Sequence, residues 1–229
     1  MRIINKKLLI IISAILFVAF IYFSYLVAKE RFTQFDFNTT VRFQDHISRK
    51  FDLIFSFFSI LGSAEVTGII WLLVFIFILI KRFWLAAVSL FLLPLALAIE
   101  LFGKVFVLHP APPHLFYRGV LDTNLPLEFI QTEFSYPSGH ETRTAFLIFF
   151  LICFFIFRTR YRFQIIALPI LIGILFIMTI SRIYLGEHWS TDVIGGFLIG
   201  TSFGLLSGAT IPSKKFSRRE EGNLHLSNS

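Results

Sequence analysis

Three groups of polar residues stand out from an otherwise apolar chain, and their types suit chemistry on a phosphate. In chain order they are Lys104 with the loop 109–114, then the turn Pro137-Ser138-Gly139-His140, then Ser181-Arg182 with His188 and Asp192. Ionisable groups that interrupt long apolar runs are costly and usually functional. We therefore take these groups as the candidate site.

The second group has the features of an anion-binding turn. Pro137-Ser138-Gly139 is typical of a tight turn, and His140 follows at the expected start of a helix. Free backbone N–H groups and the helix dipole attract anions at such a place. Lys104 and Arg182 add cationic donors that suit phosphate oxygens.

The third group predicts a histidine held by a carboxylate. His188 and Asp192 are four residues apart, so they share a face of a helical turn. The carboxylate can fix the imidazole tautomer and stabilise its charged form. His140 can protonate a leaving group. Together these residues indicate phosphoryl transfer through a histidine nucleophile.

The composition predicts that membrane helices position these residues. The chain is 56% hydrophobic and 15% charged, against about 45–50% and about 25% in ordinary soluble domains. Its formal charge of +7 is scattered between apolar segments and forms no stripe, which argues against nucleic acid as a partner. The one cysteine, Cys153, excludes an intramolecular disulfide and a thiolate metal cluster.

Uncharged runs of 14 to 21 residues predict six transmembrane helices, since a span needs about 20 residues. The runs are 8–28, 66–80, 83–99, 144–157, 163–181 and 193–213. The fourth must be extended back to Gly139 and the third onward to Lys104, while 51–62 is expected at the interface or packed on the bundle. We predict an all-α integral membrane bundle of six helices, a single domain over 1–229 with its core at 8–213 and a short tail at 214–229.

The first run also resembles a signal peptide, but it exceeds the usual apolar core of about 7–15 residues and no cleavage pattern follows. We interpret it as a retained helix. With the N-terminus inside, the inner segments hold 12 basic residues against two acids, while the outer side has a balance of −3. The positive-inside rule then predicts two cytoplasmic termini and a site at the outer face of the plasma membrane.

These residues resemble the type 2 phosphatidic acid phosphatase superfamily. Its signature is a Lys, six residues and Arg-Pro, then Pro-Ser-Gly-His, then Ser-Arg, five residues, His, three residues and Asp. The second and third parts are complete here, at 137–140 and 181–192. In the first part Ala111 stands where the family has arginine. Either another residue supplies the missing contact, which we favour, or the alanine weakens the enzyme.

Arg143 is the substitute donor that we expect, because it lies three residues after His140 and shares its helix face. Arg118 is a weaker candidate, and an interfacial anchor is the alternative role for Arg143. His109 and His114 are interpreted as exposed loop histidines. Glu100 is one turn before Lys104 and is expected to pair with it.

The resemblance implies a metal-independent lipid phosphatase without a cofactor. His188 would attack the phosphate, Asp192 would orient it, and His140 would protonate the leaving oxygen. The expected phosphate ligands are Lys104, Ser138, Gly139, Ser181 and Arg182. A metal held by His and Asp side chains stays an alternative.

The resemblance also implies a lipid phosphate as substrate, with undecaprenyl pyrophosphate and phosphatidylglycerol phosphate expected before phosphatidic acid and diacylglycerol pyrophosphate. Two alternatives lie outside enzymes. A transporter would need charges deep in several helices, whereas the polar residues here gather at one end. A non-catalytic lipid-binding protein would accommodate Ala111.

Overall fold

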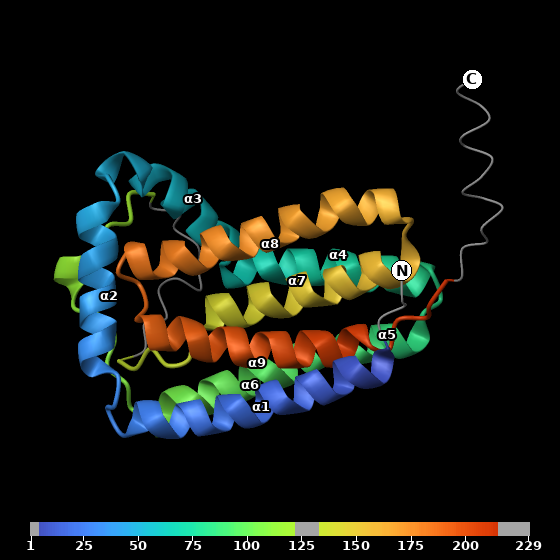
Figure 1. Ribbon diagram of the computed structural model, residues 1–229, viewed down its shortest axis with the longest axis horizontal. Coiled ribbons are helices and arrows are strands. Elements are labelled where there is room, and N and C mark those ends of the chain that lie inside the picture. Colours follow the sequence, from blue (N-terminus) through green and yellow to red (C-terminus); the bar gives the residue numbers. More distant parts are fainter. Residues whose placement is uncertain (1–4, 122–132, 215–229) are drawn as a thin grey trace.

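The computed structural model describes residues 5–121 and 133–214. Over these residues the protein is all-helical, with long apolar helices side by side (Figure 1). They are α1 (Lys6–Ala28), α4 (Ala64–Ile80), α5 (Trp84–Ser89), α6 (Leu92–Phe106), α7 (Gly139–Arg158), α8 (Tyr161–Tyr184) and α9 (Ser190–Gly208).

Five spans in this part of the chain are long and apolar enough to cross a membrane, with α5 and α6 together forming one of them. The remaining predicted span, 66–80, corresponds to α4. It qualifies when joined to Arg49–Leu61, which meets it at a bend of 49°. The predicted all-α membrane bundle is therefore confirmed.

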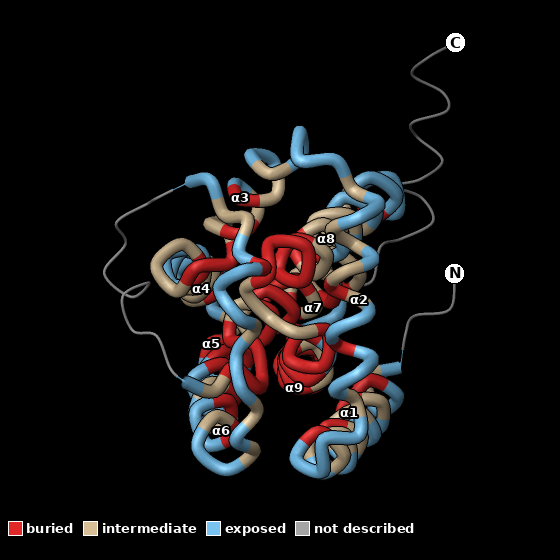
Figure 2. The backbone as a smooth tube through the Cα atoms, turned by 90° about the vertical axis from the view of Figure 1, so that its left-hand side faces the viewer, coloured by how far each residue is buried: buried red, intermediate tan, exposed pale blue. Residues whose placement is uncertain are grey.

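Shorter elements cover one end of the bundle. Helix α2 (Thr33–His46) crosses that end (Figures 1 and 2), and α3 (Asp52–Leu61) packs against α8. Two 3₁₀ turns, η1 (Arg49–Phe51) and η2 (His114–Phe116), complete this cap. The predicted interfacial segment 51–62 is α3, whereas α2 was not predicted.

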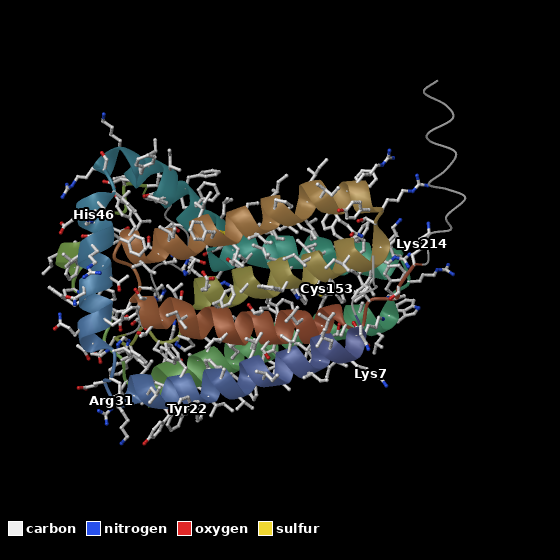
Figure 3. The ribbon with its side chains drawn as sticks, in the orientation of Figure 1. Lys7, Tyr22, Arg31, His46, Cys153 and Lys214 are labelled. Atoms are coloured by element: carbon white, nitrogen blue, oxygen red, sulfur yellow. The ribbon has the colours of Figure 1, made fainter. Side chains whose placement is uncertain are left out.

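The two ends of the bundle differ in what they carry. Arg31 and His46 lie at the end covered by α2, while Lys7 and Lys214 lie at the opposite end, near which the described chain starts and stops (Figure 3). Of the predicted tail, all but residue 214 is outside the described residues. The three polar groups of the sequence belong to the end covered by α2, since they adjoin the start of α7, the start of α9 and the close of α6.

Helices α7 and α9 form the buried centre of the bundle (Figure 2). A row of glycines on α9 allows their close approach: a Cβ on Gly204 would lie 2.7 Å from the carbonyl oxygen of Phe146. The residues of this row are Gly196, Gly200, Gly204 and Gly208. Small residues at intervals of four let membrane helices pack backbone against backbone. This packing fixes the start of α9 against the start of α7.

Replacing Gly204 with alanine should destabilise the protein by about 1–3 kcal/mol, the usual cost of overpacking a tight contact. Gly173 in α8 is the matched control, because a Cβ there would meet nothing within 4 Å. We expect Gly173→Ala to be neutral or stabilising, since alanine favours helix. Thermal unfolding in detergent measures both, and equal midpoints for the two variants would contradict the close packing.

Candidate active site

The start of α7 is a helix N-terminus facing the start of α9. Ser138 is the N-cap, and its hydroxyl accepts from the backbone N–H of Glu141 at 3.4 Å. The backbone N–H of Ser138 donates to the carbonyl of Asp192 at 2.9 Å, which ties the two helix starts together. Gly139 and His140 begin the helix, so their N–H groups have no partner within it and can bind an anion.

Glu100 connects Lys104 to this turn, because its carboxylate lies against Gly139 and pairs with the Lys104 ammonium group. A Cβ on Gly139 would lie 2.5 Å from Oε1 of Glu100, so a larger residue here would displace that carboxylate. Glu100 in turn pairs with Lys104 at 3.0 Å, as expected from their spacing. The ammonium group at the end of α6 is thereby held next to the start of α7.

The two predicted catalytic histidines lie together. The ring centroids of His140 and His188 are 6.3 Å apart. Nδ1 of His188 is 3.4 Å from Oδ2 of Asp192, whose side chain is fully buried. Because Nδ1 is the ring nitrogen on the side of the carboxylate, the other ring nitrogen of His188 is the one available to a substrate. The sequence prediction that these three residues meet therefore agrees with the geometry.

Arg182 is buried at the end of α8 and pairs with the carboxylate of Glu187 and the hydroxyl of Ser59. Ser59 on α3 also donates to Oε1 of Glu187, at 3.0 Å. Ser181 is buried as well, but its hydroxyl donates to the carbonyl of Met178 at 2.7 Å. The predicted phosphate ligand Arg182 thus has a carboxylate of its own chain as a partner, while Ser181 bonds within its helix.

Arg143 projects into the same cluster. Its guanidinium donates to the carbonyl of Gly62 at 3.3 Å, while its buried Nε has no hydrogen-bond partner in the part of the chain that the structure describes. Gly62 adjoins the site, since a Cβ there would lie 3.4 Å from Cδ2 of His140. The cations that act on His140 are Arg182, Arg143 and Lys104. An exposed interfacial anchor does not fit this placement of Arg143.

Ala111, which replaces the family's arginine, and Arg118, the weaker candidate for its role, both lie outside this cluster. Ala111 is exposed, and its N–H pairs with the carbonyl of Glu133 at 3.3 Å. Arg118 donates to the carbonyl of Gln44 at 3.1 Å and stacks 5.3 Å from the ring of Tyr184. Arg118 is thus engaged in the cap formed by α2 and α3.

The interpretation of His109 as an exposed loop residue is wrong. Its side chain is only 11% exposed, and its Nδ1 lies 2.9 Å from Oδ1 of Asp192. Leu108 adopts a left-handed backbone conformation with φ of 54°, which turns the chain at the end of α6. His114 stays exposed as expected. No local pattern could reveal the contact of His109, because 83 residues separate it from Asp192.

Fold and site define a class: an all-helical membrane protein with a histidine–carboxylate pair and a cation cluster at one end of the bundle. The sequence profile described as "PAP2 superfamily" matches residues 82–215, more than half of the chain. The chain belongs to this family. The matched region holds all three polar groups, so the family predicted from them is confirmed.

Two matches come from Bacillus subtilis, one in sequence and one in structure. Over 94 residues the chain is 33% identical to Phosphatidylglycerophosphatase B of strain 168, covering 39% of this chain and 45% of that protein. The second is the "crystal structure of the first transmembrane PAP2 type phosphatidylglycerolphosphate phosphatase from Bacillus subtilis", with a TM-score of 0.70 and 19% identity. It matches 85% of this chain and 93% of the solved one, which establishes the shared fold.

Proposed function

We propose that the protein is a lipid phosphatase that hydrolyses a phosphate or pyrophosphate monoester of a membrane lipid. The observation that carries this proposal is the pairing of His188 with buried Asp192 at 3.4 Å, with the His140 ring 6.3 Å away. A nucleophile, its orienting carboxylate and a proton donor are the groups that such a displacement needs. Membership of the PAP2 superfamily supports it.

The proposed reaction has two displacements at phosphorus. The free ring nitrogen of His188 attacks, and the bond from phosphorus to the lipid oxygen breaks while His140 gives that oxygen its proton. A phosphohistidine results. Water then attacks phosphorus and loses a proton to His140, so inorganic phosphate leaves and both histidines return to their starting states. Asp192 keeps His188 in one tautomer throughout.

The phosphate would lie over the start of α7. Lys104, Arg143 and Arg182 would neutralise its charge, and the N–H groups of Gly139 and His140 would bind its oxygens. On substrate binding, Arg182 would leave its ion pair with Glu187 and pair with the phosphate instead. Because these cations supply the charge that a metal often provides, we propose that the reaction needs none. Ser138 acts by capping α7, and we assign Ser181 to the wall of the site.

Phosphatidylglycerol phosphate is the substrate that we place first, because the Bacillus matches in sequence and in structure are described as a phosphatase of that lipid. Undecaprenyl pyrophosphate is the second. We place the protein in the plasma membrane with both termini in the cytoplasm and the site outside. The clustering of Lys7 and Lys214 at the end opposite the site supports this orientation (Figure 3).

Phosphate release from purified protein in detergent micelles tests the activity. We expect release from phosphatidylglycerol phosphate, at the same rate with and without a chelator. Lipid binding without turnover would favour a non-catalytic lipid-binding protein, and loss of activity with the chelator would indicate a metal. Spheroplasts given a short-chain substrate from outside test the orientation: release only after permeabilisation would place the site inside.

A further inference from the structure

The His109 imidazole lies between two buried carboxylates. Its Nδ1 is 2.9 Å from Oδ1 of Asp192, and its Nε2 is 3.7 Å from Oδ2 of Asp36. Asp36 is 2% exposed and Asp192 is fully buried. The contact with Asp192 is within hydrogen-bond distance and that with Asp36 is within ion-pair distance, and two carboxylates on opposite ring nitrogens favour an imidazolium.

Asp36 is held by the same helix start that contains Asp192. Its Oδ1 accepts from the backbone N–H of Thr191 at 2.9 Å, and its Oδ2 accepts from the Thr191 hydroxyl at 2.7 Å. Thr191 is the neighbour of Asp192 in the first turn of α9. Asp36 belongs to α2, which lies outside the matched region 82–215. The covering helix therefore reaches the candidate site through a residue that the family profile does not include.

The carboxylate of Asp192 is shared between two histidines. Oδ1 faces His109, while Oδ2 accepts from the backbone N–H of Trp189 at 2.9 Å and faces His188. Fixing one oxygen fixes the plane of the group, and hence the oxygen presented to the nucleophile. His109 and the Trp189 amide therefore fix the orientation of the carboxylate, each through a different oxygen.

The groups that face His109 carry negative charge. They are Asp192 from α9, Asp36 from α2 and Glu30 from the turn before α2, while the Tyr136 ring meets it edge-on. Burial lowers the pKa of His109, but the bond to Asp192 and these charges outweigh burial and raise it. For Asp36, burial has the opposite effect and raises the pKa of the carboxyl group, although the two bonds from Thr191 favour its ionised form.

We propose that His109 is a positioning residue of the phosphoryl transfer: held as an imidazolium by Asp36, it fixes Asp192 against His188 and offsets part of its charge. This inference rests on the proposed function. Without the positive charge of His109, Asp192 would stabilise protonated His188 more strongly. A protonated His188 cannot attack, so His109 keeps the nucleophile in its reactive form at lower pH.

The test replaces His109 with glutamine and uses His114→Gln, an exposed histidine of the same loop, as control. We expect kcat to fall roughly ten- to a hundredfold, the range for groups that orient a reacting side chain. KM should stay within about threefold, because His109 binds no substrate atom. The acid limb of kcat/KM should move up by about one pH unit, since a nearby charge is removed.

Asp36→Asn gives a second variant that keeps an oxygen acceptor for Thr191 but removes the charge that holds His109. Its kcat should fall and its acid limb should move in the same direction as in His109→Gln. Nitrogen-15 NMR of labelled histidine side chains, assigned with His109→Gln, provides a readout besides activity. We expect the pKa of His109 to lie above the ordinary histidine value of about 6.5.

Two results would overturn the inference: a parent-like kcat and pH profile in His109→Gln, or a His109 pKa at or below the ordinary value of about 6.5. If the parent is active, His188→Gln is inactive and His109→Gln behaves as the parent, the inference fails and the proposed function stands. If the parent releases no phosphate from any lipid offered, the proposed function fails and the inference falls with it.

Discussion

Replacing His188 with glutamine is expected to lower kcat by about four orders of magnitude or more, because removing a nucleophile removes the bond-forming group itself. Glutamine retains the size and a polar tip, so Asp192 keeps a donor and the bundle should fold. Lipid binding should persist, since the phosphate would still meet Lys104, Arg143 and Arg182. Phosphate release and lipid binding, measured on the same preparation, separate these two effects.

A covalent intermediate gives the sharper readout. Rapid quenching of the active parent should trap a phosphoenzyme that is labile to acid and stable to alkali, as a phosphorus–nitrogen bond is. His188→Gln should trap none. His46→Gln is the control, because His46 lies on α2 at the same end (Figure 3), is exposed, and its Nδ1 bonds with the carbonyl of Arg42 in its own helix. A phosphoenzyme in His188→Gln would move the nucleophile to His140.

The transmembrane core was predictable because its signal is local. Uncharged runs near 20 residues can only be satisfied by helices in a bilayer. Helix α2 was missed because it lies across the end of the bundle, where its sequence is mixed and most of it is exposed. The contact between α7 and α9 did leave a signal, in the spacing of Gly196, Gly200, Gly204 and Gly208.

In the candidate site, too, local contacts were predictable from the sequence and long-range contacts were not. His188 and Asp192 are predictable as a pair because a helical turn brings residues four apart together. The contact of Asp192 with His109 depends on how α6 and α9 pack across 83 residues of sequence. Asp36 lies 155 residues from Thr191, its partner. Long-range contacts of this kind produce no regular spacing in the sequence. The roles of Asp36 and His109 are therefore visible only in the folded structure.

The first motif has Ala111 in place of arginine. Either Arg143 supplies the missing contact to the phosphate, or the alanine weakens the enzyme, and two variants separate these alternatives. Arginine can make two parallel charge-assisted bonds to a phosphate, each contributing about 1.5–3 kcal/mol. If these bonds strengthen in the transition state, losing them costs on the order of tenfold to a hundredfold or more, at about 1.4 kcal/mol per decade. Arg143 is half-buried, and its buried Nε has no hydrogen-bond partner among the described residues, which favours this residue as the source of the contact.

Arg143→Ala is therefore expected to lose that factor in kcat/KM, while Ala111→Arg adds little, since position 111 is exposed in a paired loop. Arg158→Ala is the matched control, because Arg158 ends the same helix and donates to the carbonyl of Pro212 at the far end. Thermal unfolding of each variant in detergent excludes a loss of fold as the cause of lost activity.

The opposite pattern would show that Ala111 weakens the enzyme: Ala111→Arg would raise kcat/KM, and Arg143→Ala would change it little. Either effect should appear equally on phosphatidylglycerol phosphate and on undecaprenyl pyrophosphate, because the contact is to the phosphate that both lipids carry and not to the tail. An effect on one lipid only would assign Arg143 to recognition of that headgroup. Parent-like rates in both variants would mean that neither position reaches the phosphate, which would leave Lys104, Arg182 and the N–H groups at the start of α7 to bind it.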